Sequence, residues 1–273
     1  MGAGKLRDGI TLGPARRRRR MRRLLPGPDL PGASTPRSTH GGTGRALLAV
    51  AVLVALAAGG YVVTTDRPLG DPPAVGTGVG TFAFVHQPGR PGVPVTYDPC
   101  EPIRYAVNDA LAPAGGGRLV EEAVREVSLA TGLVFEAAGT TEDEPEWGGV
   151  VSGVPPVGGW PPVVIAWSTP EAEPELAGDV AGVGGSVVLE AMGRSQLVTG
   201  GVTLDAPTLA DALRHLDGEA RVRAVIMHEL GHVVGLGHVD DPAELMYEGN
   251  VGQTGWGPGD REGLAALGSG ECL

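Results

Sequence analysis

Aromatic residues and sequence repeats are scarce in this chain of 273 residues. Phe, Tyr and Trp together make up 4% of it, although hydrophobic residues of all kinds reach 42%, which is enough for a packed core. No fixed-period repeat is present, which excludes a repeat array. Two cysteines, Cys100 and Cys272, allow at most one internal disulfide. Gly (46) and Pro (24) are abundant instead, which predicts long, turn-rich connections.

Basic residues are also scarce after residue 45. Residues 46–273 carry 10 Lys or Arg against 30 Asp or Glu, whereas residues 1–45 carry 11 against 2. The arginine cluster from Arg16 to Arg20, taken alone, would fit a nucleic-acid patch. The segment that follows favours a simpler interpretation, a membrane-flanking tail, and we expect no nucleic-acid partner.

That segment is uncharged and apolar. Ala46 to Val63 is 18 residues long, which just reaches the length that a helix needs to span a bilayer. The basic residues before it predict that its N-terminal side is cytoplasmic. We therefore expect membrane contact through residues 46–63 and a single-pass protein with an extracytoplasmic C-terminal domain. A cleaved signal peptide is the alternative, because Ala55-Leu56-Ala57 fits a cleavage site, and the protein would then be secreted.

The chain divides into four expected parts. Residues 1–45 form a disordered basic cytoplasmic tail, 46–63 the anchor, 64–95 a semi-extended Pro/Gly-rich spacer and 96–273 one folded domain. Within the spacer, residues 81–86 are either a first strand or an attachment to the domain. Cys100 and Cys272 lie near the two ends of the domain, where an oxidising compartment favours a bridge over two free thiols.

The hydrophobic pattern of the domain predicts an α+β fold with about five strands and three helices. Helical spacing of apolar residues marks residues 118–131, 219–236 and 259–267. Strand-like segments are residues 102–107, 133–138, 163–167, 186–189 and 197–204.

Residues 228–238 read HELGHVVGLGH and carry the chemistry. His228 and His232 are four residues apart on the expected helix, so both rings project from one face and can bind one Zn²⁺. Gly235 lets the backbone leave the helix with a positive φ, which brings His238 round as a third ligand. A chance match to H-E-x-x-H-x-x-G-x-x-H is expected on the order of 10⁻⁵ times in a chain of this composition.

Three protein ligands leave one position on the ion for water, which is typical of a catalytic rather than a structural zinc. The metal lowers the pKa of that water to about 7 and polarises a substrate carbonyl. Glu229 lies beside the first ligand and is placed to accept the water's proton as general base. A single histidine is more often a core or surface residue, but three in register with a glutamate favour the metal site.

The same residues, followed by AELMY at 243–247, resemble the metzincin zinc peptidases, within them the matrixin-like branch of bacterial membrane-anchored or secreted proteins. The resemblance is strong over residues 219–267 and looser from Cys100 onward. It implies a zincin or metzincin-like fold: a twisted, mixed and mainly parallel sheet with an antiparallel edge strand, and an active-site helix carrying HExxH. It also implies that Met246 supports the metal site and that an extended substrate pairs with the edge strand, either 183–190 or 197–204.

We therefore expect a zinc metalloendopeptidase with one catalytic Zn²⁺, which hydrolyses extracytoplasmic proteins or peptides through a metal-activated water. The alternative is a catalytically silent, zinc-stabilised binding domain at the cell surface. Loss of Glu229 or of one ligand would be the mark of that alternative, and neither has occurred. A zinc hydrolase of non-peptide substrates would use the same ligands, so a substrate screen separates it from the peptidase.

Overall fold

The computed structural model describes residues 68–78, 80–85, 93–249 and 252–272. The expected cytoplasmic tail and the apolar segment 46–63 lie outside these residues. In the part of the chain that is described, no helix is both long enough and apolar enough to cross a bilayer.

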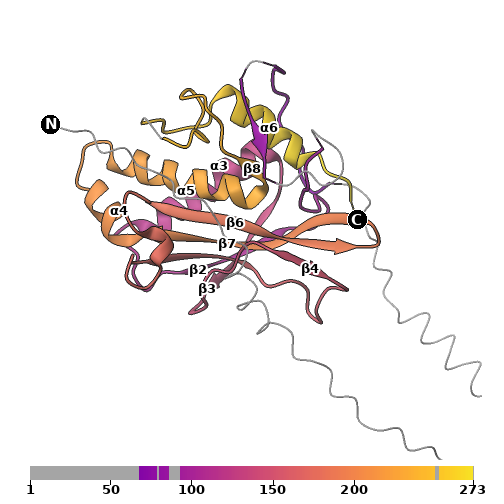
Figure 1. Ribbon diagram of the computed structural model, residues 1–273, viewed down its shortest axis with the longest axis horizontal. Coiled ribbons are helices and arrows are strands. Elements are labelled where there is room, and N and C mark those ends of the chain that lie inside the picture. The colour runs from indigo at the N-terminus through magenta and orange to yellow at the C-terminus, as the bar shows by residue number, and fades with distance from the viewer. Residues whose placement is uncertain (1–67, 79, 86–92, 250–251, 273) are drawn as a thin grey trace, which may run out of the picture.

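A six-stranded sheet forms the centre of the fold, in the order β3-β2-β5-β7-β6-β4 (Figure 1). β2, β3, β5 and β7 run parallel to one another, β6 is antiparallel to β7, and β4 is parallel to β6. The sixth strand, β4, was not expected, because three residues within a Gly- and Pro-rich loop leave too short a hydrophobic pattern. The strands are β2 (Ile103–Asn108), β3 (Phe135–Thr140), β4 (Val150–Ser152), β5 (Val163–Ser168), β6 (Gly182–Ala191) and β7 (Arg194–Asp205).

The described residues contain four α-helices, one more than the sequence predicts. They are α3 (Gly116–Thr131), α4 (Ala206–Ala212), α5 (Gly218–Val234) and α6 (Pro258–Gly268), with a 3₁₀ turn η2 at Pro174–Leu176. The unexpected helix, α4, has only seven residues and begins directly after β7. Asp205, the last residue of β7, caps it by accepting a hydrogen bond from the Thr208 N–H at 3.0 Å.

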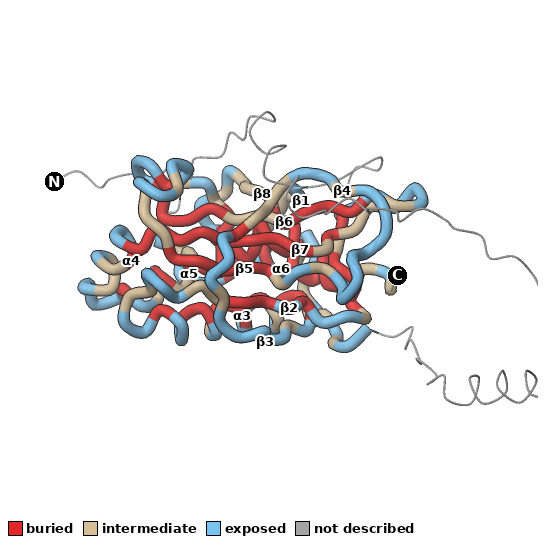
Figure 2. Tube along the Cα trace, turned by 90° about the horizontal axis from the view of Figure 1, so that it is seen from below, coloured by how far each residue is buried: buried red, intermediate tan, exposed pale blue. Residues whose placement is uncertain are grey.

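The hydrophobic core lies between the sheet and the helices above it (Figures 1 and 2). α3 turns its apolar face inward, where Val120, Ala123 and Val127 are fully buried. β5 is buried on both faces, as its continuous apolar run predicts, because it lies in the middle of the sheet. α5 packs against α3 and also against β6 and β7. This position places α5 next to the antiparallel strand of the sheet.

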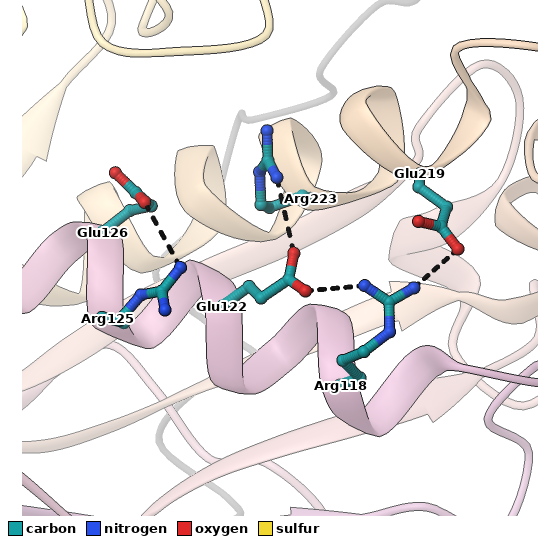
Figure 3. A network of polar contacts seen from close by, with 6 residues as sticks. All are labelled: Arg118, Glu122, Arg125, Glu126, Glu219 and Arg223. Atoms are coloured by element: carbon teal, nitrogen blue, oxygen red, sulfur yellow. Dashed lines mark hydrogen bonds and ion pairs between the residues drawn. The ribbon is translucent and has the colours of Figure 1, made fainter.

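Ion pairs join α3 and α5 at the surface (Figure 3). Arg118 contacts both Glu122 and Glu219 at 2.6 Å, and Arg223 contacts Glu122 at 3.4 Å. The Arg118 side chain is 48% exposed. Exposed pairs of this kind contribute little because solvent screens them, so the apolar contacts beneath them hold the two helices together.

The described residues of the expected spacer pack on the domain instead of standing free of it. The Leu69 N–H donates to the Pro99 carbonyl at 2.9 Å, and the Gly78 N–H donates to Glu262 Oε2 at 2.7 Å. Further on, β1 (Ala83–Phe84) pairs antiparallel with β8 (Leu236–Gly237) in a separate two-stranded sheet. The high Gly and Pro content predicts a semi-extended chain here, but small residues also permit close packing of backbone on backbone. The segment 81–86 does contain a first strand.

Cys100 and Cys272 form a disulfide, as expected, with their Cα atoms 5.4 Å apart. The bond connects the segment before β2 to the residues that follow α6. It closes a loop over a sequence separation of 172 residues, so it encloses the whole sheet and all four helices.

Candidate metal centre

Helix α5 positions the first two histidines of the motif. His228 and His232 lie in its last two turns and are 3% and 5% exposed. The helix ends at Val234, two residues earlier than expected, because Gly235 adopts φ 117° and its N–H bonds back to the Gly231 carbonyl at 3.1 Å. This left-handed turn requires glycine and leads directly into β8 and His238.

The three imidazole rings converge on one point. The Nε2 atoms of His228 and His232 are 3.2 Å apart, and each lies 3.0 Å from His238 Nε2. One Zn²⁺ at about 2.0–2.1 Å from each nitrogen would separate them by about 3.4 Å in a tetrahedral arrangement. The triangle of nitrogen atoms is therefore close to the size that such an ion requires.

The backbone fixes which ring nitrogen carries the proton. His228 Nδ1 lies 2.8 Å from the Leu245 carbonyl oxygen, and His232 Nδ1 lies 2.8 Å from the Leu236 carbonyl oxygen. A carbonyl only accepts, so each Nδ1 is protonated and each Nε2 turns a lone pair toward the other rings.

The Nε2 atoms of His228 and His232 that face one another stay unprotonated at neutral pH. Burial lowers the pKa of His228 to about 4, and burial also lowers the pKa of His232. Lone pairs about 3 Å apart repel one another unless a cation lies between them. The three residues therefore fit a metal ion that prefers neutral imidazole, as Zn²⁺ does. His228, His232 and His238 are also the histidines whose ligand atoms group together in the described residues.

Glu229, on α5, is 3% exposed and lies against the start of β6. A Cβ on Gly182 would come within 2.9 Å of Glu229 Cγ, and one on Gly184 within 2.7 Å of the Glu229 carbonyl oxygen. Only glycine permits this close approach of strand and helix. Sequence reasoning missed both glycines, although the run GVGG inside a strand was an available signal.

Met246 lies against α5, the helix that carries His228 and His232, and is 1% exposed. A Cβ on Gly231 would come within 2.8 Å of Met246 Sδ, so the methionine packs directly against the helix between them. Asp260 of α6 fixes the backbone at Leu245 and Met246. Its carboxylate accepts hydrogen bonds from the N–H groups of these two residues at 2.5 and 3.3 Å. Since the Leu245 carbonyl orients the ring of His228, α6 is coupled to the metal centre through one residue.

A second buried carboxylate, that of Glu244, also joins α6 to the residues around Met246. Glu244 accepts hydrogen bonds from the N–H groups of Gly259 and Asp260, both at 2.9 Å, at the N-terminus of α6. Glu244 and Asp260 are each 1% exposed, and burial raises the pKa of Asp260. Sequence reasoning missed both, because a single acidic residue in a turn or first helical turn is usually a surface residue.

Part of this chain matches a family of known proteins. Residues 166–254 match the family model of the matrixins, described as Peptidase_M10. The match covers less than half of the chain but includes α5, all three histidines, Glu229 and Met246. It supports a metzincin-like family. The mixed sheet with its four helices is compatible with a matrixin-like fold.

No curated protein matches this chain. One solved structure that is similar to it is described as "GM1 bound form of the ECX AB5 holotoxin". That chain is 12% identical, and the match covers 62% of this chain and 80% of the other with a TM-score of 0.37. A likeness at this level supports no inference about this protein.

Proposed function

We propose that this protein is a zinc-dependent endopeptidase whose metal is held by His228, His232 and His238. The observation that carries the proposal is the convergence of three Nε2 atoms within 3.2 Å of one another, with a buried carboxylate on the residue beside the first ligand. The matrixin match supports a metallopeptidase and hence a protein or peptide substrate.

The chain's own groups have separate roles in this proposal. Zn²⁺, when bound, supplies a Lewis acid that lowers the pKa of a water molecule and polarises a carbonyl oxygen. Glu229 accepts the proton of the attacking water at its carboxylate and passes it to the leaving amine. The carbonyls of Leu245 and Leu236 hold the rings of His228 and His232 in the tautomer that binds metal.

The edge of the sheet next to Glu229 is the proposed binding surface for the substrate backbone. Two strands were candidates, residues 183–190 and 197–204. The second lies within β7, which pairs with β5 on one side and β6 on the other and so has no open edge. The first lies within β6, and among the described residues Gly182–Gly185 pair with β7 alone. An extended peptide can therefore add to β6 beside Glu229 by strand addition.

We further propose that the domain lies outside the cytoplasm, either anchored by residues 46–63 or released by cleavage near residue 57. Support comes from the basic segment before the apolar one and from the disulfide, which persists in oxidising compartments. Mass measurement of the mature N-terminus distinguishes the two forms.

A substrate screen tests the enzymatic proposal. The full chain is stripped with a chelator, reloaded with one equivalent of Zn²⁺ and incubated with casein, a peptide library and a matched panel of non-peptide esters. Hydrolysis of peptides that needs Zn²⁺ and is lost in Glu229→Ala is the expected result. Tight zinc binding without any hydrolysis would favour the silent binding domain, and hydrolysis of esters alone would indicate a different zinc hydrolase.

A further inference from the structure

The proposed substrate edge of β6 is open over only part of its length. From Ser186 onward it is covered by residues 147–152, which we call the edge cap. The Gly148 N–H donates to the Ser186 carbonyl at 2.9 Å, and the Val188 N–H donates to the Gly149 carbonyl at 3.2 Å. β4 then pairs in parallel with β6 from Val188 to Glu190 (Figure 1).

The open part can be located from the alternation of a strand. In an antiparallel pair, the N–H and C=O of one residue point to the same side, and those of the next residue point to the other. The Ser186 carbonyl and the Val188 N–H both point to the cap, away from β7. Gly184 and Gly182 have the same parity, so their N–H and C=O groups face the open side. These are also the two glycines that lie against Glu229.

Trp147 anchors the edge cap to the sheet. Its side chain packs on the small cluster of Leu176, Val180 and Val183. It also lies against Gly185, where a Cβ would come within 3.1 Å of Trp147 Cδ1. The cap is thus held by an aromatic contact as well as by backbone hydrogen bonds, and a peptide cannot displace it merely by competing for the Ser186 carbonyl.

We propose that the edge cap is a specificity determinant that limits how much of a substrate can pair with β6. The inference rests on the proposed peptidase function. A peptide strand that starts beside Glu229 can pair with Gly182–Gly185 and must leave the sheet at Ser186. On one side of the cleaved bond, only about four residues then contribute to recognition through the backbone.

A length series of peptides tests this limit in the zinc-loaded full chain. Starting from a peptide that the chain cleaves, residues are added one at a time to either end. Along β6, lengthening the peptide up to about four residues is expected to raise kcat/KM, by about 2- to 10-fold for each added residue that gains one or two backbone hydrogen bonds. Further residues on that side change kcat/KM less than twofold. A steady rise through six or more residues on both sides overturns the proposal.

Substitution of Trp147, which holds the edge cap on the sheet, provides a second test. Trp147→Ala is expected to extend the length dependence beyond four residues on the limited side, whereas Trp160→Ala, which changes the same residue type in the loop after β4, leaves it at four. An unchanged limit in folded, zinc-bound Trp147→Ala overturns the role of the cap.

Binding of the same labelled peptides to zinc-loaded Glu229→Ala separates this inference from the proposed function. If peptides bind with the four-residue limit but the wild type never cleaves them, the peptidase function is refuted and the role of the edge cap in binding stands. Peptides that neither bind nor are cleaved refute both.

Discussion

Glu229 lies against two glycines of β6, which have no side chains. A carboxylate that acts as a general base must be held within hydrogen-bond reach of the proton it accepts. Gly182 and Gly184 bring β6 so close to α5 that Glu229 has little room to turn. The side chain is 3% exposed as a result. We infer that these glycines position the base without contacting the substrate through any side chain.

Gly182→Ala tests this positioning. The added methyl group would come within 2.9 Å of Glu229 Cγ and 3.2 Å of its Oε1, so the carboxylate must shift. We expect kcat to fall by roughly 10- to 100-fold, as for other displacements of about 1 Å, while KM and zinc content stay within twofold. Gly117→Ala, where a Cβ meets nothing within 4 Å, is the control and keeps wild-type kinetics. Wild-type kcat in Gly182→Ala would show that the base has room to adapt.

Asp260 is the residue through which α6 supports the metal centre. Asp260→Asn replaces an acceptor by a donor against the N–H groups of Leu245 and Gly257, which lie 2.5 and 2.9 Å from Oδ2. We expect a loss of about 1–3 kcal/mol of unfolding free energy, because a buried donor is left unsatisfied. We also expect zinc affinity to fall about 10- to 100-fold, since the turn that orients His228 loosens.

Urea unfolding and competition with a chromophoric chelator measure the two effects. Asp211→Asn is the matched control, because Asp211 is 66% exposed on α4. If Asp260→Asn behaved like this control in both measurements, the proposed coupling between α6 and the metal centre would be wrong.

At the scale of single residues, the motif could be predicted because all of its members lie within eleven consecutive positions. The spacing along one helix is enough to place His228 and His232 together. The contacts of Gly182 and Asp260 join residues 47 and 15 positions away from their partners Glu229 and Leu245. Such pairs depend on how whole elements pack, which a single sequence does not indicate.

At the scale of elements, the pairing of β1 with β8 braces the turn between the second and third ligands. The Val85 N–H donates to the Gly235 carbonyl at 2.9 Å, and Phe84 pairs with Leu236. The Leu236 carbonyl is the group that orients the ring of His232. The segment expected to be either a first strand or an attachment to the domain therefore supports the ligand loop directly.

Val85→Pro removes this N–H and leaves the side chain apolar. We expect a 2- to 10-fold weaker affinity for Zn²⁺, corresponding to the loss of about one backbone hydrogen bond. Val85→Ala keeps the N–H and is expected to bind zinc as the wild type does. Chelator competition measures both variants, and equal affinities in the two would contradict a bracing role for β1.

The elements that could be predicted are those with a long hydrophobic pattern. α3 and α5 have 16 and 17 residues, enough for several turns of apolar spacing. β4 and α4 have three and seven, and both owe their structure to a neighbour: β4 to the edge of β6, and α4 to the cap at Asp205. Tertiary context, rather than local sequence, determines such short elements.

At the scale of the whole molecule, the disulfide between Cys100 and Cys272 ties the start of the domain to its end. Closing a loop of this length reduces the entropy of the unfolded chain by an amount equivalent to about 4–5 kcal/mol, an upper figure. We expect the double variant Cys100→Ser, Cys272→Ser to lose about 2–5 kcal/mol of unfolding free energy. Reduced wild type should lose the same amount, while zinc stoichiometry stays at one. Equal stability of oxidised wild type and the double variant would argue against a stabilising bridge.

We propose above all that Glu229 performs base catalysis at a zinc site formed by three histidines. The most direct measurement is kcat/KM for one cleaved peptide, with wild type and Glu229→Gln at equal zinc occupancy. We expect kcat/KM to fall roughly 10²- to 10⁴-fold in Glu229→Gln with unchanged zinc affinity. Equal turnover by the two proteins would show that Glu229 is not the general base.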